Sequence, residues 1–377
     1  MSKVNIQTLT PIHIGSGNFL RHNTDFVAWK ESAENYIGIV DPRKVLDLIG
    51  VDEIGNWVSM IELGKDTKEF VKQKSGCDSP KLYSTRFFKN NANVQPNDTL
   101  KECIHDGLGR AYIPGSSIKG AIRTAVLATL SKGENGLEQQ VCRMGRNGRA
   151  SVTAKHIESK LFGNDPNSDI FRFLLVGDAY FMHGSEMSTR LINLNIRERQ
   201  NLVDKSKSQI VEAISSNCYS EAQIKINLGY NIWASSKWPL NAKSTLGNLP
   251  KEMSDLESLF TLINKHTQNL LCDEIELWNE VQEFGCIGAE GYIDKLCDIQ
   301  KVINSCINGK ECVLRLGHAS GWRFITGAWA ENLKNFESDV VPASRSGNFK
   351  YKDYDFPKSR RLDEASNVFG FIKLSLG

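Results

Sequence analysis

The stretch from Ala111 to Ser131, AYIPGSSIKGAIRTAVLATLS, constrains the fold of this chain more than any other segment. A short apolar lead ends in a Pro-Gly-Ser turn, because proline fixes φ and glycine permits positive φ. From Ser117 on, apolar residues recur at three- and four-residue spacing, which predicts one face of an amphipathic helix. Ser116 or Ser117 is suited to be the N-cap of this helix.

The first two turns of this helix carry two cations, Lys119 and Arg123, which share a face because they lie four residues apart. The helix dipole disfavours cations at an N-terminus and prefers anions there. Gly115, Ser116 and Ser117, with free N–H groups beside these cations, therefore indicate a phosphate-binding site. The alternative is a capped surface helix whose two basic residues are solvated.

Length and composition set few limits. With 377 residues the chain is long enough for two or more domains, and its formal net charge of +2 requires that any basic surface be local. We expect no signal peptide and no membrane span, because no apolar run approaches 18 residues. The nine cysteines form no C-x-x-C pair, which argues against zinc and favours reduced thiols in a cytoplasm. We expect no cofactor.

The order of the expected elements predicts an α+β fold. In the first half we expect a strand at 3–10, a hairpin of 25–29 with 36–40, helices at 43–49 and 58–71, short strands at 103–104 and 111–113, the central helix and a strand at 171–181. This order fits a βαββαβ sandwich with helices on one face of an antiparallel sheet. A second round begins with 190–197 and 221–233, followed by two or three helices within 251–307 and strands at 312–316 and 369–374.

Two loops combine glycines with groups that bind phosphate. The first, Pro11 to Gly17, holds His13, Gly15, Ser16 and Gly17, and its glycines let the backbone approach a ligand closely. The second, GHASGWR from Gly317 to Arg323, adds Ser320 for phosphate, Trp322 for base stacking and Arg323 for either. For the second loop, the alternative is a tight turn with a tryptophan in the core.

Two basic segments complete the set of RNA-binding candidates. Lys358, Arg360 and Arg361 lie beside Tyr351, Tyr354 and Phe356, a mixture that suits phosphate neutralisation and stacking as well as a solvated tail. The polar segment 132–150 carries Arg143, Arg146 and Arg149 between glycines. It is either a disordered loop or an arm that becomes ordered on RNA.

Catalytic chemistry has weaker support. His13 and His105 are candidates for a general acid or base in RNA cleavage, but either would need a partner that the sequence does not identify. Asp25 and Asp178 have no carboxylate cluster around them, so we predict structural roles for both and no metal site.

Five motifs in order carry a resemblance that none carries alone: TPIHIGSG, YIPGSSIKGAIRTAVL, KLFG with DIFRFLLVGDAYF, LRLGHASGW and FPKSRRL. Together they resemble the RAMP superfamily of CRISPR systems over essentially the whole chain. Within it, the chain looks most like the type III-A (Csm) effector subunit that caps the 3′ end of the crRNA, the fifth Csm subunit. The loop GHASGW departs from the family's run of glycines, and the helical block 251–307 lies outside the superfamily core.

The resemblance implies a pair of ferredoxin-like (RRM-type) βαββαβ domains with glycine-rich loops, at 1–185 and 186–377, the second with the helical insertion. It implies a non-catalytic, crRNA-binding subunit in antiviral defence, associated with crRNA maturation. The expected partners are crRNA, target RNA and other Csm subunits (the backbone RAMP subunits and the small subunit), with no membrane. The alternative is a RAMP-type endoribonuclease that cleaves crRNA precursor with a histidine. The expected RNA-binding residues are His13, Gly15, Ser16, Gly17, Gly115, Ser116, Ser117, Lys119, Arg123, Gly317, His318, Ser320, Gly321, Trp322, Arg323, Lys358, Arg360 and Arg361.

Overall fold

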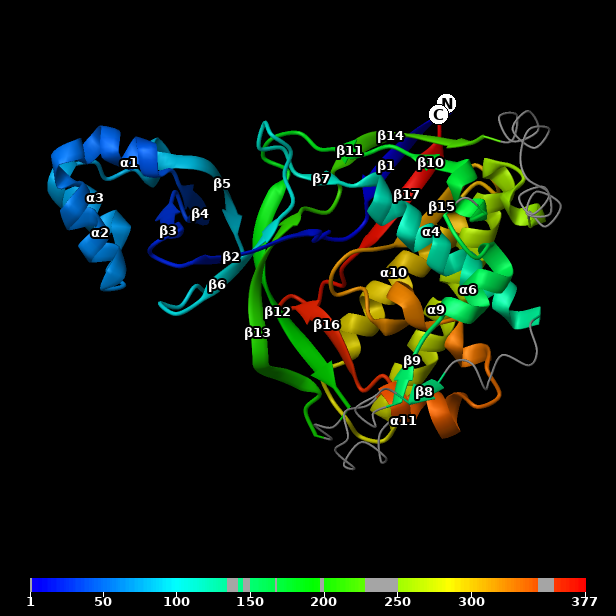
Figure 1. Cartoon of the computed structure of the whole chain (residues 1–377). Coiled ribbons are helices and arrows are strands. Elements are labelled where there is room, and N and C mark those ends of the chain that lie inside the picture. Colours follow the sequence, from blue (N-terminus) through cyan, green and yellow to red (C-terminus); the bar gives the residue numbers. More distant parts are fainter. Residues whose placement is uncertain are drawn as a thin grey trace.

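The computed structural model describes residues 2–133, 142–144, 150–166, 168–196, 200–227, 250–344 and 356–377. These residues form a mixed α+β fold built around two large sheets (Figure 1), which confirms the expected class. Most of the polar segment 132–150, the end of the alternating segment 221–233, and Tyr351 and Tyr354 lie outside the described residues.

The first sheet is antiparallel and joins the two ends of the chain, which lie together in Figure 1. Its order is β10 (Leu174–Val176), β14 (Tyr219–Ile226), β1 (Ser2–Thr8), β17 (Phe371–Leu376) and β15 (Glu311–Arg315). Val4, Ile6 and Thr8 of β1 are buried while Lys3 and Asn5 are exposed, as the alternation of this segment predicts.

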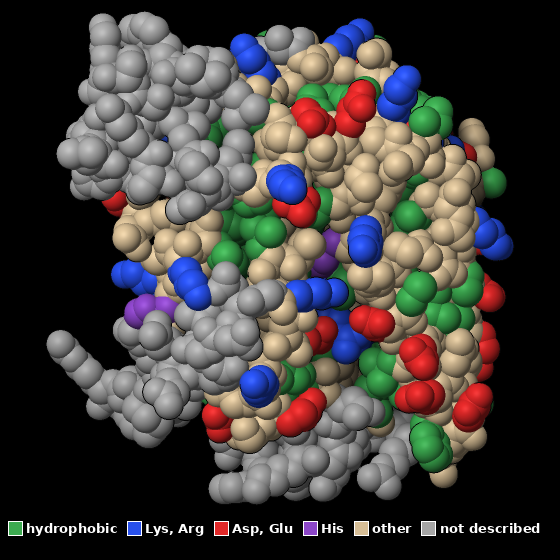
Figure 2. Space-filling view, turned by 90° about the vertical axis from the view of Figure 1, so that its right-hand side faces the viewer, with side chains coloured by type: hydrophobic (Ala, Val, Ile, Leu, Met, Phe, Trp, Pro, Cys, Tyr) green, Lys and Arg blue, Asp and Glu red, His purple; other side chains and the backbone are tan. Residues whose placement is uncertain are grey.

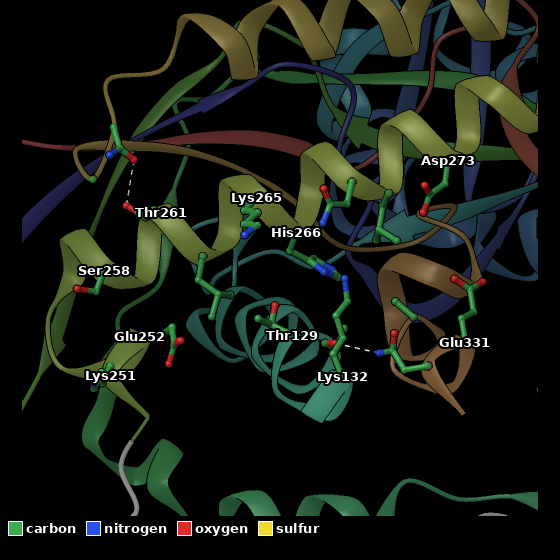
Figure 3. Close-up of a pocket in the computed structure, with 18 of the residues that line it drawn as sticks. Thr129, Lys132, Lys251, Glu252, Ser258, Thr261, Lys265, His266, Asp273 and Glu331 are labelled. Atoms are coloured by element: carbon green, nitrogen blue, oxygen red, sulfur yellow. Dashed lines mark hydrogen bonds between the residues drawn. The ribbon is translucent and has the colours of Figure 1, made fainter. Parts of the chain in front are cut away.

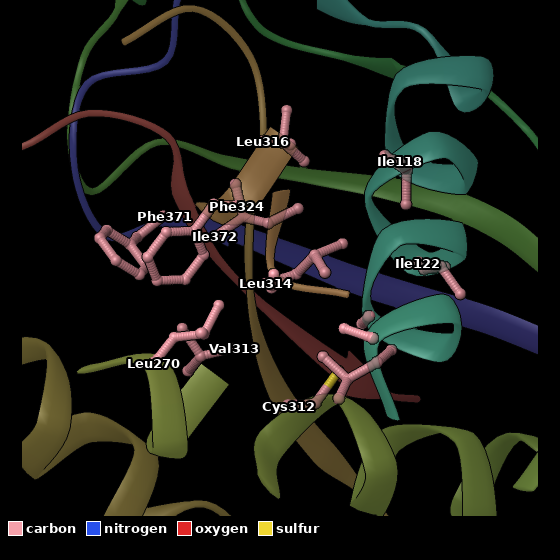
Figure 4. Close-up of a cluster of buried hydrophobic side chains, with 14 of the residues drawn as sticks. Ile118, Ile122, Leu270, Cys312, Val313, Leu314, Leu316, Phe324, Phe371 and Ile372 are labelled. Atoms are coloured by element: carbon pink, nitrogen blue, oxygen red, sulfur yellow. The ribbon is translucent and has the colours of Figure 1, made fainter. Parts of the chain in front are cut away.

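Helices cover one face of this sheet. α4 (Gly115–Leu130) and α9 (Leu256–Glu283) pack on each other and on β15, and α10 (Glu290–Ser305) packs on α9. Ile118 and Ile122 of α4 and Leu314 of β15 belong to the same buried hydrophobic cluster (Figure 4). The predicted central helix and the helices within 251–307 are confirmed, but neither Ser116 nor Ser117 caps α4, because both lie inside it and Pro114 precedes its first turn.

The second sheet has more strands, eight against five, and it is curved (Figure 1). Its order is β2 (Gly15–Arg21), β6 (Thr99–Cys103), β13 (Val203–Ile214), β12 (Glu186–Asn195), β5 (Ser84–Asn90), β4 (Glu34–Val40) and β3 (Phe26–Glu31), and β16 (Ser359–Asp363) also pairs with β12. β13 runs parallel to β6 and β12 runs parallel to β5, whereas the other pairs are antiparallel. The expected hairpin of 25–29 with 36–40 is confirmed.

Three short helices cover the far end of this sheet: α1 (Pro42–Ile49), α2 (Ile54–Glu62) and α3 (Thr67–Ser75). Asp41 accepts a hydrogen bond from the Arg43 N–H and so caps α1. The prediction of one helix over 58–71 is wrong. The chain turns at Gly64, which has a φ of +63°, and Asp66 then caps a new helix by accepting from the Lys68 N–H.

The predicted strand 171–181 is also divided. A 3-10 turn at Ile170–Phe173 leads into β10, and after Gly177 the chain enters β11 (Ala179–Tyr180), which pairs with β7 (Tyr112–Ile113) outside the first sheet. The remaining elements are β8 (Cys142–Met144), β9 (Ala150–Val152), α6 (Lys155–Phe162) and α11 (Val341–Ser344).

Strands from both sides of residue 185 share the sheets: β1 pairs with β14 and β17, and β5 and β6 pair with β12 and β13. The division into 1–185 and 186–377 stays a prediction about folding units. Among the described helices, none combines the length and the apolar composition that crossing a bilayer requires.

Candidate nucleic-acid interface

The two glycine-containing loops meet, although 300 residues separate them in the sequence. The His318 N–H donates to the His13 carbonyl at 2.9 Å, and the two imidazole rings lie edge to face with centroids 5.5 Å apart. A Cβ on Gly317 would lie 2.8 Å from that same carbonyl oxygen, and the φ of Gly317 is +82°. Glycine at this position is therefore what lets the loops close on each other.

Two cations flank His318 from the second sheet. Lys101 Nζ, on β6, lies 3.4 Å from His318 Nδ1, and Arg361 Nη1, on β16, lies 3.5 Å from His318 Nε2. Neither cation makes an ion pair with a carboxylate of the described ranges. Burial and the neighbouring Arg361 lower the pKa of Lys101. We call Lys101, His318 and Arg361 the basic cluster.

His13 and His318 are uncharged at neutral pH. Burial lowers the pKa of His318 to about 4, helped by the positive charges of Lys101 and Arg361. Burial also lowers the pKa of His13 to about 4, and its Nδ1 is hydrogen-bonded to the Glu212 carbonyl at 2.6 Å. The positive charge of the region thus comes from Lys101 and Arg361, and their half-buried charges favour an anion beside them.

The first loop presents exposed backbone next to the basic cluster. Gly15, Ser16 and Gly17 form the exposed start of the edge strand β2. A Cβ on Gly15 would lie 3.2 Å from His13 Nε2 and 3.7 Å from Lys101 Cε, so this glycine lies against the lysine. A ligand held by Lys101 can therefore approach the main chain of β2 closely.

Two of the predicted phosphate-binding groups at the start of α4 already have carboxylate partners within the protein. The Gly115 N–H donates to Asp178 Oδ1 at 2.7 Å, and Arg123 makes ion pairs with Glu158 at 2.9 Å and Asp169 at 2.8 Å. An RNA phosphate would have to compete with these carboxylates. Lys119 is half-buried, and burial lowers its pKa.

α4 nevertheless lies next to the second glycine loop. A groove of about 410 Å³ has Ser117 and Gly120 of α4 on one side and Leu316, Gly317 and Phe324 on the other. Ser116, in the first turn of α4, is exposed. The structure therefore brings together residues from all four predicted RNA-binding segments: those at 13–17, 115–117 and 317–321, and Arg361 of the basic segment 358–361.

The two arginines of the basic segment 358–361 point to opposite faces of β16, because successive side chains of a strand alternate. Arg360 points inward and is buried, where its guanidinium holds both carboxylate oxygens of Glu274 in α9, with Nη2–Oε2 at 2.9 Å. Arg361 points to the other side, at His318. Lys358 precedes β16 and is half-buried.

Other predicted side chains of the second loop also serve the protein interior. Arg323 pairs with Glu331 at 2.7 Å, and the Trp322 ring packs against Phe356 at 4.9 Å between centroids. Ser320 is buried and donates to the Leu316 carbonyl at 2.7 Å. Gly321 has a φ of +83° and turns the chain. For Trp322 these contacts match the alternative of a packed indole.

A group of possible metal ligands lies nearby, around Glu212, whose carbonyl is hydrogen-bonded to His13. Ligand atoms of Glu102, His105 and Glu212 lie within 4.8 Å of one another. Arg86 already bridges the two carboxylates, at 3.0 Å from each, and His105 Nε2 lies 3.2 Å from Glu212 Oε1. The arginine thus supplies the positive charge that this pair of acids needs.

The helical side of the molecule has a different character. Lysines and arginines are interspersed with acidic side chains on the face shown in Figure 2. A pocket of about 660 Å³ between α4 and α9 has Lys132 and His266 pointing toward each other, with Asp273 and Glu331 at one end (Figure 3). A surface of mixed charge does not suit the binding of a continuous polyanion such as RNA. The basic cluster is therefore the better candidate for an RNA-binding site.

Comparison with known proteins agrees with the fold. A family model described as the RAMP superfamily matches residues 5–291, which is more than half of the chain. The chain belongs to the RAMP superfamily. The structure of this RAMP protein is similar to the crystal structure of Csm5 from T. onnurineus, with a TM-score of 0.64 and 21% identity over 98% of this chain and 99% of that chain.

It is also similar to a chain of a cryo-EM structure titled as a Csm-crRNA-target RNA ternary complex of a type III-A CRISPR-Cas system. Here the TM-score is 0.69, with 18% identity over 100% of both chains. At these identities the two structures establish the fold. A comparison with curated protein sequences found no match.

Sequence reasoning missed Lys101, the cation that completes the basic cluster. The segment around it was expected only as a short strand at 103–104. The strand pattern contained one indication. Lys101 and Cys103 are two residues apart on β6 and therefore share a face, and Cys103 is buried, so Lys101 points to the same side as a buried residue. Its meeting with His318 and Arg361 depends on contacts between three distant segments, which no local pattern contains.

Proposed function

We propose that this RAMP protein is a crRNA-binding structural subunit of a type III-A (Csm) effector complex in antiviral defence. It caps the 3′ end of the guide and takes part in crRNA maturation. Membership of the superfamily and the full-length likeness to Csm5 and to a chain of a Csm-crRNA-target RNA complex support this. The partners are then crRNA, target RNA and other Csm subunits, namely the backbone RAMP subunits and the small subunit.

The observation that carries the proposal is the basic cluster under the glycine loops. Lys101 and Arg361 are half-buried, lie on either side of an uncharged His318, and have no carboxylate partner in the described part of the chain. A phosphate group would supply the missing negative charge through charge-assisted hydrogen bonds. The exposed main chain at Gly15–Gly17 would let a backbone pass close by, without reading its sequence.

The finer fold assignment belongs to the same proposal. The antiparallel sheet β10-β14-β1-β17-β15, covered on one face by α4 and α9, supports one ferredoxin-like unit, and the second sheet would supply the other. Eight of the nine cysteines are free thiols in the structure, all but Cys142, whose side chain is not described, and this is compatible with a cytoplasmic location.

We also propose that the chain does not itself cleave RNA. His13 is buried with a pKa of about 4, and His105 lies against Glu212, so neither is placed at an open surface as a general acid. The test is incubation of the purified chain with RNA, with and without divalent ions. Cleavage that disappears in His13→Ala would support the endoribonuclease instead.

The binding test uses fluorescence anisotropy with a labelled single-stranded RNA between about 50 and 200 mM salt. Lys101→Ala with Arg361→Ala should weaken binding and reduce the slope of log K against log salt by about one per lost phosphate contact. Lys301→Ala is the matched control, because Lys301 is an exposed lysine of α10 whose only described ion pair is with Asp298. Equal binding by all three proteins would contradict the proposal.

A further inference from the structure

A stack of two tyrosines and an arginine projects from the short β7–β11 sheet. Tyr112 of β7 lies directly opposite Tyr180 of β11, and their rings are stacked with centroids 5.3 Å apart and planes 26° apart. The guanidinium carbon of Arg110 lies 4.9 Å from the centroid of the Tyr180 ring. We propose that this stack binds a base of the single-stranded RNA, a site that rests on and deepens the proposed function.

The stack is exposed where a ligand could reach it. Tyr180 is 42% exposed, Met182 two residues later is 79% exposed, and Leu108, two residues before Arg110, is 73% exposed. Tyr112 is half-buried. Aromatic and apolar side chains gathered on a surface in this way mark a binding site more often than isolated ones do.

The stack is also held in place by its surroundings. Asp106 fixes Arg110, with Nε–Oδ2 at 2.8 Å, and Ser220 Oγ donates to the Tyr180 carbonyl at 2.6 Å. Asp178, next to Tyr180, is bonded to the Gly115 N–H. Both nearby carboxylates are therefore already partnered, and little side-chain entropy remains to be lost when a base adds to the stack.

A nucleobase suits this surface better than a protein side chain because of what lies beside it. From Lys101 on β6 the chain continues through Cys103 to His105, which forms a β-bridge with Ala111, the residue before Tyr112. Four residues of extended chain span about 13 Å. An RNA strand held by its phosphates at the basic cluster can therefore reach the stack, whose rings and guanidinium accept any base face.

The experiment measures RNA binding by the full chain with the same labelled oligonucleotide and salt series. Tyr180→Ala should weaken binding about 5- to 140-fold, the range of one base–aromatic stack, and leave the salt slope unchanged. Tyr180→Phe should bind as the wild type does. Tyr36→Ala is the matched control, because Tyr36 is stacked on Trp29 in the distant β3–β4 hairpin.

The outcomes separate this site from the proposed function. If Lys101→Ala lowers affinity and salt slope while Tyr180→Ala binds normally, the stack is not an RNA site and the proposed function stands. If the wild type binds no RNA, both fail. An alanine variant that binds RNA normally but no longer assembles with other Csm subunits would assign the stack to a protein contact and overturn the proposal.

A second measurement covers a variant that does not fold. RNA containing 4-thiouridine is cross-linked to the wild-type chain by ultraviolet light, and the modified peptides are mapped by mass spectrometry. Cross-links at Tyr112 or Tyr180 are expected. Cross-links confined to peptides around Lys101 and His318 would overturn the stacking site.

Discussion

Arg360 and Arg361 are neighbours on β16, yet they have opposite surroundings. Arg360 is buried against Glu274, which also accepts hydrogen bonds from Trp278 Nε1 at 2.9 Å and Tyr292 Oη at 2.8 Å. Arg361 faces His318 and has no described carboxylate partner. Two identical, adjacent side chains of a strand can therefore point to opposite faces, one into the core and the other toward the proposed RNA site.

The two arginines connect the helical block to the proposed RNA site. Glu274 lies in α9, which falls within the residues 5–291 that the superfamily model matches rather than outside the core as expected, and it holds β16 through Arg360. Arg323 of the second glycine loop also lies 3.6 Å from Glu274. α9 therefore anchors both segments that present Arg361 and His318.

The largest expected effect is on the buried side of this comparison. Glu274→Ala should lower the free energy of unfolding by about 3–5 kcal/mol, because it leaves the Arg360 charge buried without its partner. Urea denaturation followed by circular dichroism measures it. The exposed Glu276 of the same helix gives the control, since Glu276→Ala should change stability by no more than about 0.5 kcal/mol. A Glu274→Ala protein of normal stability would show that the buried Glu274–Arg360 pair does not stabilise the fold.

Acid should weaken the same pair in a defined range. Burial alone would raise the pKa of Glu274, but Arg360, Tyr292 and Arg323 hold it at about 2, below the usual 4.5. A lowered carboxylate pKa stabilises the fold above pH 4.5, and this stabilisation is lost as pH falls toward 2; the difference corresponds to about 3 kcal/mol.

Urea unfolding of the wild type and Glu274→Gln between pH 5 and 3 tests this linkage. The gap in stability between the two proteins should narrow as the pH falls below 4.5, because the glutamate of the unfolded chain then binds a proton while that of the folded protein stays charged, which favours unfolding of the wild type. A constant gap would show that Glu274 does not titrate in this range, and that the stability of the buried pair has another origin.

Local patterns in the sequence predicted much of the fold, since strand alternation and helical spacing are local properties. β1, the β3–β4 hairpin, α4, α9 with α10 and β17 were all expected. The position of β1 between β14 and β17 was not, because strand pairing depends on distant segments. The single helix over 58–71 failed because the break at Gly64 was not recognised.

The candidate site shows the same limit. The glycine loops were found by their composition, but the meeting of Lys101, His318 and Arg361 was not, because it needs contacts between three segments. The inward orientation of Arg360 could have been predicted from the strand pattern. Leu362 is buried, and in a strand the residue two positions earlier shares its face, so Arg360 rather than Arg361 should point inward.

The smallest expected effect is a pH dependence on the open side of the comparison. In the free protein, burial and the charges of Lys101 and Arg361 hold the pKa of His318 at about 4, with His13 as its other neighbour. A bound phosphate would offset those charges and raise this pKa toward its ordinary value of 6.5. Binding would then take up a proton, so RNA affinity should rise as pH falls from 7.5 to 5.5, by at most about tenfold. Anisotropy titrations measure it, with circular dichroism confirming the fold at each pH. His318→Gln should make the affinity independent of pH in this range; a rise that persists in this variant would place the proton on another group.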